Sequence, residues 1–210
     1  MAIKHIYRDL DEVFVDVHHG FQLLSGIPDP IQGHEWPSDR TLQEHVGFDY
    51  PVCQEKSAQA QEAFWRTMEA TPHGCSIAMA CSQVAIQIGA ALSILTDTSG
   101  SHFAALGKVG WLHDHLPMLA PDFCGTTDKT LFAHPDARLI DDSHHVAEAF
   151  HKAGGRAIVI PQVWNNWKMA YGSPRTPKIN ELLLLAAQFD YPELSIFDKQ
   201  SFNLYEPERG

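Results

Sequence analysis

The chain has 210 residues, a length that suits one domain or one domain with a small insertion. Hydrophobic residues make up 44% of the sequence and charged residues 20%, a globular balance that excludes a disordered or fibrous chain. The 15 Lys and Arg residues and 26 Asp and Glu residues give a formal net charge of −11, which repels polyphosphate backbones and argues against a nucleic-acid partner.

Cysteine usage and the amino terminus bear on the cellular compartment. The four cysteines, at positions 53, 75, 81 and 124, form no CxxC pair and suggest no disulfide framework. The first residues do not read as a signal peptide. We therefore expect a reduced, cytoplasmic protein. The sequence leaves the oligomeric state open, with a homodimer as one option.

Residues 75–95 carry no charged side chain and are long enough, in principle, to cross a bilayer. Gln83, Gln87 and several serines lower the hydrophobicity of this stretch, and Gly89 interrupts it before the strand-like sequence LSIL. A buried helix that leads into a buried strand explains the pattern better than a membrane span, so we expect no membrane partner.

Helical and strand-like patterns alternate along most of the chain. The predicted strands cover residues 4–10, 92–96, a short segment near Phe123, 138–140 and 156–160. The predicted helices cover residues 13–24, 55–70, 76–90, 108–116, 146–153 and 178–189. Residues 26–50 are rich in Pro, Gly, His and Asp and are expected to be irregular.

Strands that alternate with helices indicate βαβ units and a parallel sheet with right-handed crossovers. We therefore predict an α/β fold, a Rossmann-like three-layer sandwich with a parallel sheet. The irregular and helical region over residues 21–71 is then an insertion after the first strand. The core domain comprises residues 1–20 and 72–210, and its last helix is expected to pack on the flank of the sheet.

Polar side chains end three of the predicted strands. They are Asp9 and Asp11, Thr96 and Asp97, and Asp141 and Asp142. Ligands of open parallel sheets bind where the strands end at their carboxyl side, so these groups are expected to converge. Clustered carboxylates repel one another unless a cation compensates them, and their hard oxygens suit Mg²⁺. The sequence therefore predicts a magnesium site with room for a substrate phosphate.

Phosphoryl transfer needs a nucleophile, a metal ion and a cation that holds the phosphoryl group. Asp9 can attack as a carboxylate and form an aspartyl-phosphate. Asp11 lies two residues further on the same face of an extended chain, and it can protonate the leaving oxygen and later activate water. Thr96 can donate a hydrogen bond to phosphoryl oxygens, and Lys108 or Lys129 can supply positive charge.

The order of these motifs resembles the haloacid dehalogenase-like (HAD-like) phosphohydrolases and, more closely, the 5'(3')-deoxyribonucleotidases of that superfamily. The likeness covers roughly residues 3 to 165 by motif order and spacing. The segments that carry it are DLDEVFVDVHHGF at 9–21, FWRTMEATPHG at 64–74, KVGWLHDHLP at 108–117, TTDKT at 126–130, and RLIDD with FHKAGGRAIVIPQVWN within 138–165. A single segment of this kind is weak, whereas five in the family's order are specific.

The resemblance implies roles for the acidic residues. Asp9 is expected to be the nucleophile and a Mg²⁺ ligand. Asp11 is expected to be the general acid and base, with its backbone carbonyl on the metal. Asp141 and Asp142 complete the metal shell, one directly and one through water.

The resemblance also implies how the substrate is bound. Thr96, Asp97 and Lys108 are expected to hold the phosphate, with Lys108 as the cation of the third motif. Lys129 is expected to lie near the substrate as a further basic residue. The insertion over residues 21–71 is expected to be a small helical cap.

The aromatic residues of the predicted cap bear on the leaving group. Phe64 and Trp65 are candidates for contact with a nucleobase, although aromatic residues in a short helix more often belong to a core. His18 is a further candidate for substrate binding, because the chain has Val17 where relatives carry an aromatic residue that stacks on the base.

Two further departures from the family pattern concern the catalytic loops. Glu12 stands where relatives usually have Gly, and Asp97 stands where the phosphate-binding motif typically has Ser. Together with Val17, and with Thr127 where some relatives have Arg, these changes weaken the nucleotide assignment and leave the phosphohydrolase assignment standing. The leading hypothesis is a Mg²⁺-dependent phosphatase of (deoxy)nucleoside monophosphates. The alternatives are a phosphatase of another small phosphomonoester, such as a sugar phosphate, and a catalytically silent binding protein of the same fold.

A different class of metal-dependent hydrolase is suggested by the run His113-Asp114-His115, which resembles the HD dyad of helical phosphohydrolases. Such sites need additional His and Asp ligands on surrounding helices of an all-helical fold. Because this chain alternates strands and helices, we interpret the run as a solvated helix face.

Overall fold

The computed structural model describes residues 3–26, 50–72, 74–98, 101–160 and 162. Within this part of the chain, five parallel strands form one sheet in the order β3-β2-β1-β4-β5. In chain order the strands are β1 (His5–Arg8), β2 (Ala91–Thr96), β3 (Phe123–Gly125), β4 (Ala137–Asp141) and β5 (Arg156–Val159). Every predicted strand is present, so the predicted parallel sheet is confirmed.

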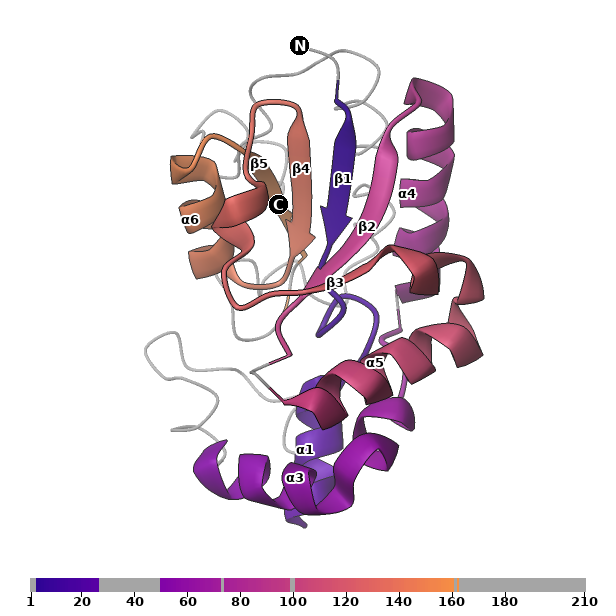
Figure 1. Cartoon of the computed structure of the whole chain (residues 1–210), viewed down its shortest axis with the longest axis vertical. Helices are drawn as coiled ribbons and strands as arrows, with labels where there is room; N and C mark the ends of the chain where they lie inside the picture. The colour runs from indigo at the N-terminus through magenta and orange to yellow at the C-terminus, as the bar shows by residue number, and fades with distance from the viewer. Residues whose placement is uncertain (1–2, 27–49, 73, 99–100, 161, 163–210) are drawn as a thin grey trace, which may run out of the picture.

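The helices connect the strands and cover both faces of the sheet (Figure 1). They are α1 (Val17–Ser25), α3 (Tyr50–Arg66), α4 (Gly74–Ile88), α5 (His102–His115) and α6 (His144–Lys152), with short 3₁₀ helices η1 (Pro117–Asp122) and η2 (Lys129–Phe132). The helix α3 is interrupted at Gln61, whose φ angle is 56°. The helix predicted over residues 178–189 lies outside the described residues.

The core divides into two layers because successive side chains of a strand point to opposite faces. On β1, Ile6 belongs to the layer that includes Ile77 and Val84 of α4. Its neighbour Tyr7 belongs to the layer that includes Phe150 of α6. The same alternation runs through β2, β4 and β5, so the sheet is sandwiched between α4 and α6. The predicted α/β Rossmann-like sandwich is therefore confirmed.

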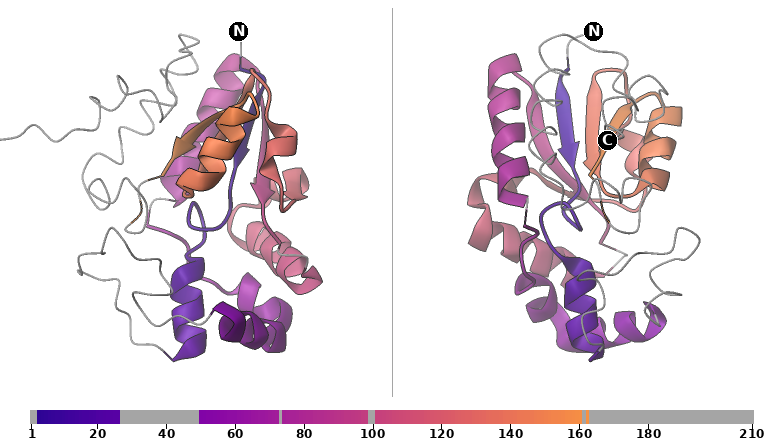
Figure 2. Two further views of the ribbon diagram at one scale, coloured as in Figure 1. Left: turned by 90° about the vertical axis from the view of Figure 1, so that its left-hand side faces the viewer. Right: turned by 180° about the vertical axis from the view of Figure 1, so that it is seen from behind.

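Helices α1 and α3 form a lobe below the sheet, towards which β1 points (Figures 1 and 2). The lobe packs against α5 through α3. A Cβ atom on Gly107 of α5 would lie 2.4 Å from Cβ of Trp65 and 2.6 Å from the carbonyl oxygen of Glu62, so the close approach of the two helices requires glycine there. The lobe thus lies at the carboxyl end of the sheet, where the polar strand ends converge.

Several helices begin away from the predicted residue, and capping and turn contacts explain the difference for α1 and α5. The helix predicted from residue 13 begins at Val17, because Phe14 and Val15 both donate backbone hydrogen bonds to the carbonyl of Leu10 in a tight turn. Asp16 then caps the helix. The helix predicted from residue 108 begins at His102, because the Ser101 hydroxyl accepts the Ala104 N–H and starts it earlier.

The uncharged stretch over residues 75–95 is divided between two elements. Helix α4 occupies its first part and ends before Gly89, which has a φ angle of 70°. Strand β2 follows in the middle of the sheet. Among the described residues, no helix combines the length and the apolar character that a membrane span needs.

Candidate active site

Three acidic side chains meet at the carboxyl end of the sheet. Asp9 follows β1, Asp141 ends β4 and Asp142 comes next. A hydrogen bond from the Asp9 N–H to the Ile140 carbonyl, 2.8 Å long, continues the pairing of β1 with β4 and keeps the two strand ends together. One carboxylate oxygen from each of the three acids lies within 4.8 Å of the others. The structure thus brings together three of the four residues predicted to hold a metal ion.

Lys129 lies between the acidic groups of β1 and β4. Its Nζ is 2.8 Å from Oδ2 of Asp9 and 2.7 Å from Oδ2 of Asp141, and only 7% of its side chain is exposed. Burial alone lowers the pKa of a lysine, but the two carboxylates outweigh burial and raise the pKa of Lys129, so the ammonium group stays charged. Sequence reasoning placed Lys129 near the substrate; the structure places it in contact with the predicted nucleophile.

Lys108 holds Asp11, the residue predicted to be the general acid and base. Its Nζ donates to Oδ2 of Asp11 at 2.7 Å and to the Thr96 hydroxyl at 3.2 Å, and it also contacts the backbone carbonyl of Asp97. The Lys108 side chain is buried in the middle of α5. Its ammonium group lies 5.3 Å from the centre of the Trp65 ring, within cation–π range.

Carboxylates outnumber lysines at this site, and burial penalises the excess negative charge. Burial raises the pKa of Asp141 to about 6, the Asp9 carboxylate adds to the rise, and Lys129 opposes it. The pKa of Asp11 is raised for the same reasons, by burial first, with Lys108 opposing it and Asp9 adding to it. Oδ1 of Asp11 is buried with no hydrogen-bond partner within the described ranges.

The donor atoms and the charge of this site can be compared with those that a divalent cation needs. The donors are carboxylate oxygens at short mutual distances, which are the ligands that Mg²⁺ prefers. Two lysines leave the cluster of Asp9, Asp11, Asp141 and Asp142 with an excess of negative charge. The residues present therefore fit Mg²⁺.

Other predicted substrate contacts lie around this cluster. Phe64 and Trp65 pack with Phe21 of α1, with ring centroids 5.2 to 5.8 Å apart, and both are half-buried. His18 lies in the first turn of α1, with its ring Nδ1 2.6 Å from the Glu12 carboxylate. These aromatic groups belong to the lobe that faces the carboxyl end of the sheet.

Asp97 differs from the other predicted phosphate ligands. It is exposed, whereas Thr96 is fully buried, and its described contact with Lys108 comes from the backbone carbonyl. A role for its side chain in phosphate binding stays a prediction.

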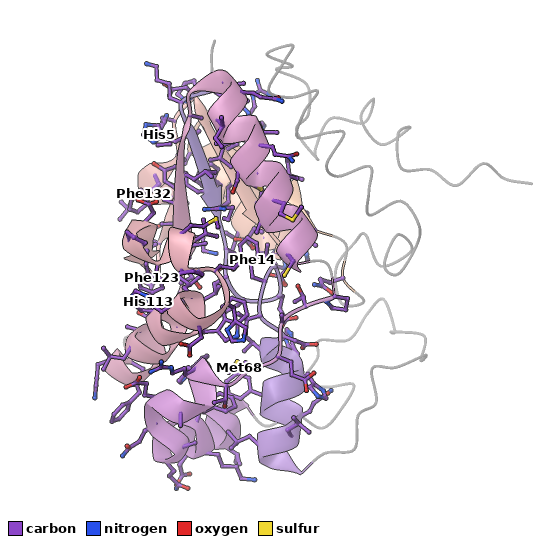
Figure 3. All side chains as sticks on the ribbon, turned by 90° about the vertical axis from the view of Figure 1, so that its right-hand side faces the viewer. His5, Phe14, Met68, His113, Phe123 and Phe132 are labelled. Carbon is purple, nitrogen blue, oxygen red and sulfur yellow. The ribbon has the colours of Figure 1, made fainter. Side chains whose placement is uncertain are left out.

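The run His113-Asp114-His115 ends α5, and all three side chains are exposed; His113 is labelled in Figure 3. Asp114 pairs with Arg66 of α3 through two hydrogen bonds of 2.8 and 3.1 Å, and both side chains are exposed. Within the described residues, the only group of three or more possible metal ligands is the acidic cluster at the strand ends. Asp114 therefore contributes to the contact between lobe and core through a surface ion pair.

Sequence reasoning missed the roles of Glu12 and Gln162. Glu12 has a φ angle of 58°, in the left-handed region that favours glycine. Gln162 donates a 2.7 Å hydrogen bond to the Glu12 carbonyl from 150 residues further along the chain. For Glu12, the sequence signal was a charged residue at a position where the resembled family usually has glycine. For Gln162 there was no signal, because a contact across 150 residues leaves no local pattern in a sequence.

Comparisons with known proteins agree on the fold. No protein-family model and no curated protein sequence matches the chain. Among solved structures, a conserved haloacid dehalogenase-like protein of unknown function from Agrobacterium tumefaciens aligns with 89% of this chain and 100% of its own, at a TM-score of 0.55 and 15% identity. This similarity shows that the α/β fold is HAD-like.

Two further structures are more distant. A haloacid dehalogenase-like family hydrolase from Xanthomonas campestris aligns with 89% of this chain and 94% of its own, with a TM-score of 0.49 and 15% identity. A HAD family enzyme from Bacteroides thetaiotaomicron, in complex with magnesium and inorganic phosphate, aligns with 81% of this chain and 100% of its own, with a TM-score of 0.42 and 12% identity.

Proposed function

We propose that this protein is a Mg²⁺-dependent phosphomonoester hydrolase that works through an aspartyl-phosphate on Asp9. The observation that carries this proposal is the contact of Asp9 with Lys129, at 2.8 Å, inside the cluster formed with Asp141 and Asp142. A nucleophilic carboxylate, a buried cation and a set of hard oxygen ligands are the groups that phosphoryl transfer requires.

The reaction has two steps. A carboxylate oxygen of Asp9 attacks the phosphorus atom while the bond to the leaving-group oxygen breaks, and Asp11 gives its proton to that oxygen. Water then attacks the phosphorus atom of the aspartyl-phosphate, Asp11 takes a proton from this water, and the bond between phosphorus and Asp9 breaks. Inorganic phosphate leaves, and both carboxyl groups return to their initial state.

The neighbouring residues support these roles. Burial raises the pKa of Asp11, which favours the protonated form that the first step uses. Lys129 stays charged beside Asp9 and can neutralise charge on the transferred phosphoryl group. The Thr96 hydroxyl lies 3.2 Å from Lys108 Nζ, so these two groups can bind phosphoryl oxygens together.

Asp9, Asp141, Asp142 and the backbone carbonyl of Asp11 are the groups that would hold Mg²⁺. When bound, the ion would neutralise the phosphoryl oxygens and orient them for in-line attack. The distant Bacteroides thetaiotaomicron enzyme that contains magnesium and phosphate is compatible with this assignment.

The leaving group that we propose is a nucleoside, preferably a deoxynucleoside. The resemblance to 5'(3')-deoxyribonucleotidases supports it, as do the half-buried rings of Phe64 and Trp65 in the lobe formed by α1 and α3. We propose that residues 21–71 are the cap. The flat face of a nucleobase suits contact with aromatic rings. The alternative is another small phosphomonoester, such as a sugar phosphate, because Val17 replaces the aromatic residue that stacks on the base in relatives.

Phosphate release from a panel of phosphomonoesters tests the proposal. The panel contains ribo- and deoxynucleoside monophosphates and several sugar phosphates, each with Mg²⁺ and with EDTA. The Asp9→Asn variant removes the nucleophile, and Asp136→Asn is a matched control that removes a carboxylate at the other end of the sheet.

We expect release that needs Mg²⁺, is lost in Asp9→Asn, persists in Asp136→Asn and favours deoxynucleotides. Release that favours sugar phosphates would keep the mechanism and replace the substrate. No release from any substrate, together with tight binding of a phosphomonoester, would indicate a silent binding protein.

A further inference from the structure

Glu12, the residue that follows Asp11, has a backbone conformation that L-amino acids rarely adopt. Its φ angle of 58° lies in the left-handed region that favours glycine. The residue is nonetheless buried, with 4% of its surface exposed. A strained backbone and a buried carboxyl group both cost free energy, so specific contacts must hold Glu12 in place.

Both the backbone and the side chain of Glu12 have hydrogen-bond partners. Its N–H donates to the Val15 carbonyl at 2.7 Å, and its carbonyl accepts from Gln162 Nε2 at 2.7 Å. Its Oε1 accepts the backbone N–H of His18 at 2.7 Å and lies 2.6 Å from Nδ1 of the His18 ring. These contacts tie the loop that carries Asp11 to the segment after β5 and to the first turn of α1.

The contact between Glu12 and α1 is distinct from the N-cap of that helix. Asp16 directly precedes the helix and accepts the His19 N–H at 2.9 Å, which is the usual pattern of an N-cap. Glu12 lies six residues before His18 and reaches the helix from the catalytic loop. Its carboxylate therefore joins the loop to the lobe, in addition to the N-cap contact of Asp16.

The geometry points to Glu12 as a positioning residue for Asp11, because its contacts fix the loop from which Asp11 reaches the leaving group. This inference rests on the proposed function, in which Asp11 protonates the leaving-group oxygen. Lys108 holds one carboxylate oxygen of Asp11, whereas the other has no hydrogen-bond partner within the described part of the chain. The direction of that second oxygen thus depends on the backbone conformation that Glu12 maintains.

The experiment compares two leaving groups that differ in their need for a proton. An alkyl phosphate releases an alkoxide that must be protonated, whereas p-nitrophenyl phosphate releases a stable phenolate. Glu12→Gly accepts the left-handed backbone but removes the carboxylate, and Glu12→Gln keeps an acceptor for the His18 N–H. His19→Gln is a matched control on the same helical turn, because its backbone hydrogen bond to Asp16 remains.

In Glu12→Gly we expect kcat/KM for the alkyl phosphate to fall by about 10²-fold, and kcat/KM for p-nitrophenyl phosphate to fall by about threefold or less, because only the alkoxide needs a proton to leave. We compare kcat/KM because it reports the first step, whereas kcat also includes the second step, in which Asp11 takes a proton from water with either substrate. Glu12→Gln should recover most of the loss, and His19→Gln should match the wild type. In metal-free protein, the His18 amide hydrogen should exchange faster in Glu12→Gly than in either other variant.

Three outcomes would overturn the inference. Equal losses of kcat/KM for the two substrates in Glu12→Gly would indicate a purely structural role, and unchanged kcat/KM for both would indicate no role. In either of these two cases, loss of phosphate release in Asp9→Asn in the same assays would show that the proposed function stands and that only the positioning role of Glu12 fails. A wild-type protein that hydrolyses neither substrate nor any member of the wider panel would overturn both.

Discussion

The two ends of the central sheet carry the same kinds of charged groups in different surroundings. At the carboxyl end, Lys129 bridges Asp9 and Asp141, and at most a tenth of any of these side chains is exposed. At the amino end, Lys4 lies 3.3 Å from Asp136, with 70% of the lysine side chain exposed. His134 also contacts Asp136 there.

Burial decides what each set of charges can do. Exposed pairs such as Lys4 and Asp136 are screened by water and contribute little to stability. Buried charges interact strongly, but each one that lacks a partner is costly. The carboxyl end therefore holds groups with shifted pKa values and an excess of negative charge, and those are the properties that metal binding and proton transfer require.

The largest effect is expected when the cation at the carboxyl end is removed. Lys129→Met leaves Asp9 and Asp141 buried without their shared partner, and breaking such a pair costs about 3–5 kcal/mol. Phosphate release should also fall by about 10²- to 10³-fold, because the charge that stabilises the phosphoryl group is lost. Phosphate assays and urea denaturation in EDTA measure the two effects. Wild-type stability in this variant would contradict the account of the buried charges.

A somewhat smaller effect is expected from Mg²⁺ itself. An ion that binds only the folded protein stabilises it by about 2.7 kcal/mol at a hundredfold excess over Kd. Thermal unfolding should therefore shift upward with Mg²⁺ in the wild type and in Asp136→Asn, and much less in Asp142→Asn, which loses a ligand. An equal shift in Asp142→Asn would place the ion elsewhere.

Lys108 offers a sharper test within the carboxyl end, because it contacts Asp11 and Thr96 but not Asp9. In Lys108→Met, kcat should fall by about 10²-fold with a smaller loss of stability than in Lys129→Met, because 26% of the Asp11 side chain remains exposed to water. Denaturation curves of the two variants, measured side by side, check this order. A larger loss of stability in Lys108→Met than in Lys129→Met would contradict this account.

The smallest effect is expected at the amino end. The His134 contact lowers the pKa of Asp136 to about 2, so the charged form contributes stability that is present above about pH 4 and is lost as the pH falls towards 2. Asp136→Asn should lower the melting temperature near pH 7 only slightly. Between pH 4 and pH 2, the melting temperature of this variant should fall less steeply than that of the wild type. A large loss of stability at neutral pH would show that the two ends do not differ as described.

Much of the fold and part of the site were predictable because they depend on local patterns. The strands alternate with helices, and acidic residues follow the strands at Asp9 and Asp141, so a parallel sheet dictates that these residues meet. The position of Lys129 depends on how η2 packs against α6, and that packing has no signature in the sequence. The start of α1 at Val17 depends on the turn around Leu10 and on the left-handed backbone of Glu12, which a helical pattern does not reveal.

The most direct test of the central claim is to detect a phosphoryl group on Asp9 during turnover. Wild-type protein is mixed with a substrate that the phosphate assay identifies and is quenched in acid within the turnover time. The protein is then digested, and the mass of the peptide that contains residue 9 is measured by mass spectrometry. We expect this peptide to carry one phosphoryl group when Mg²⁺ is present, and none in EDTA or in Asp9→Asn. Rapid phosphate release by Asp9→Asn, or a phosphoryl group on a different residue of the wild type, would contradict the account.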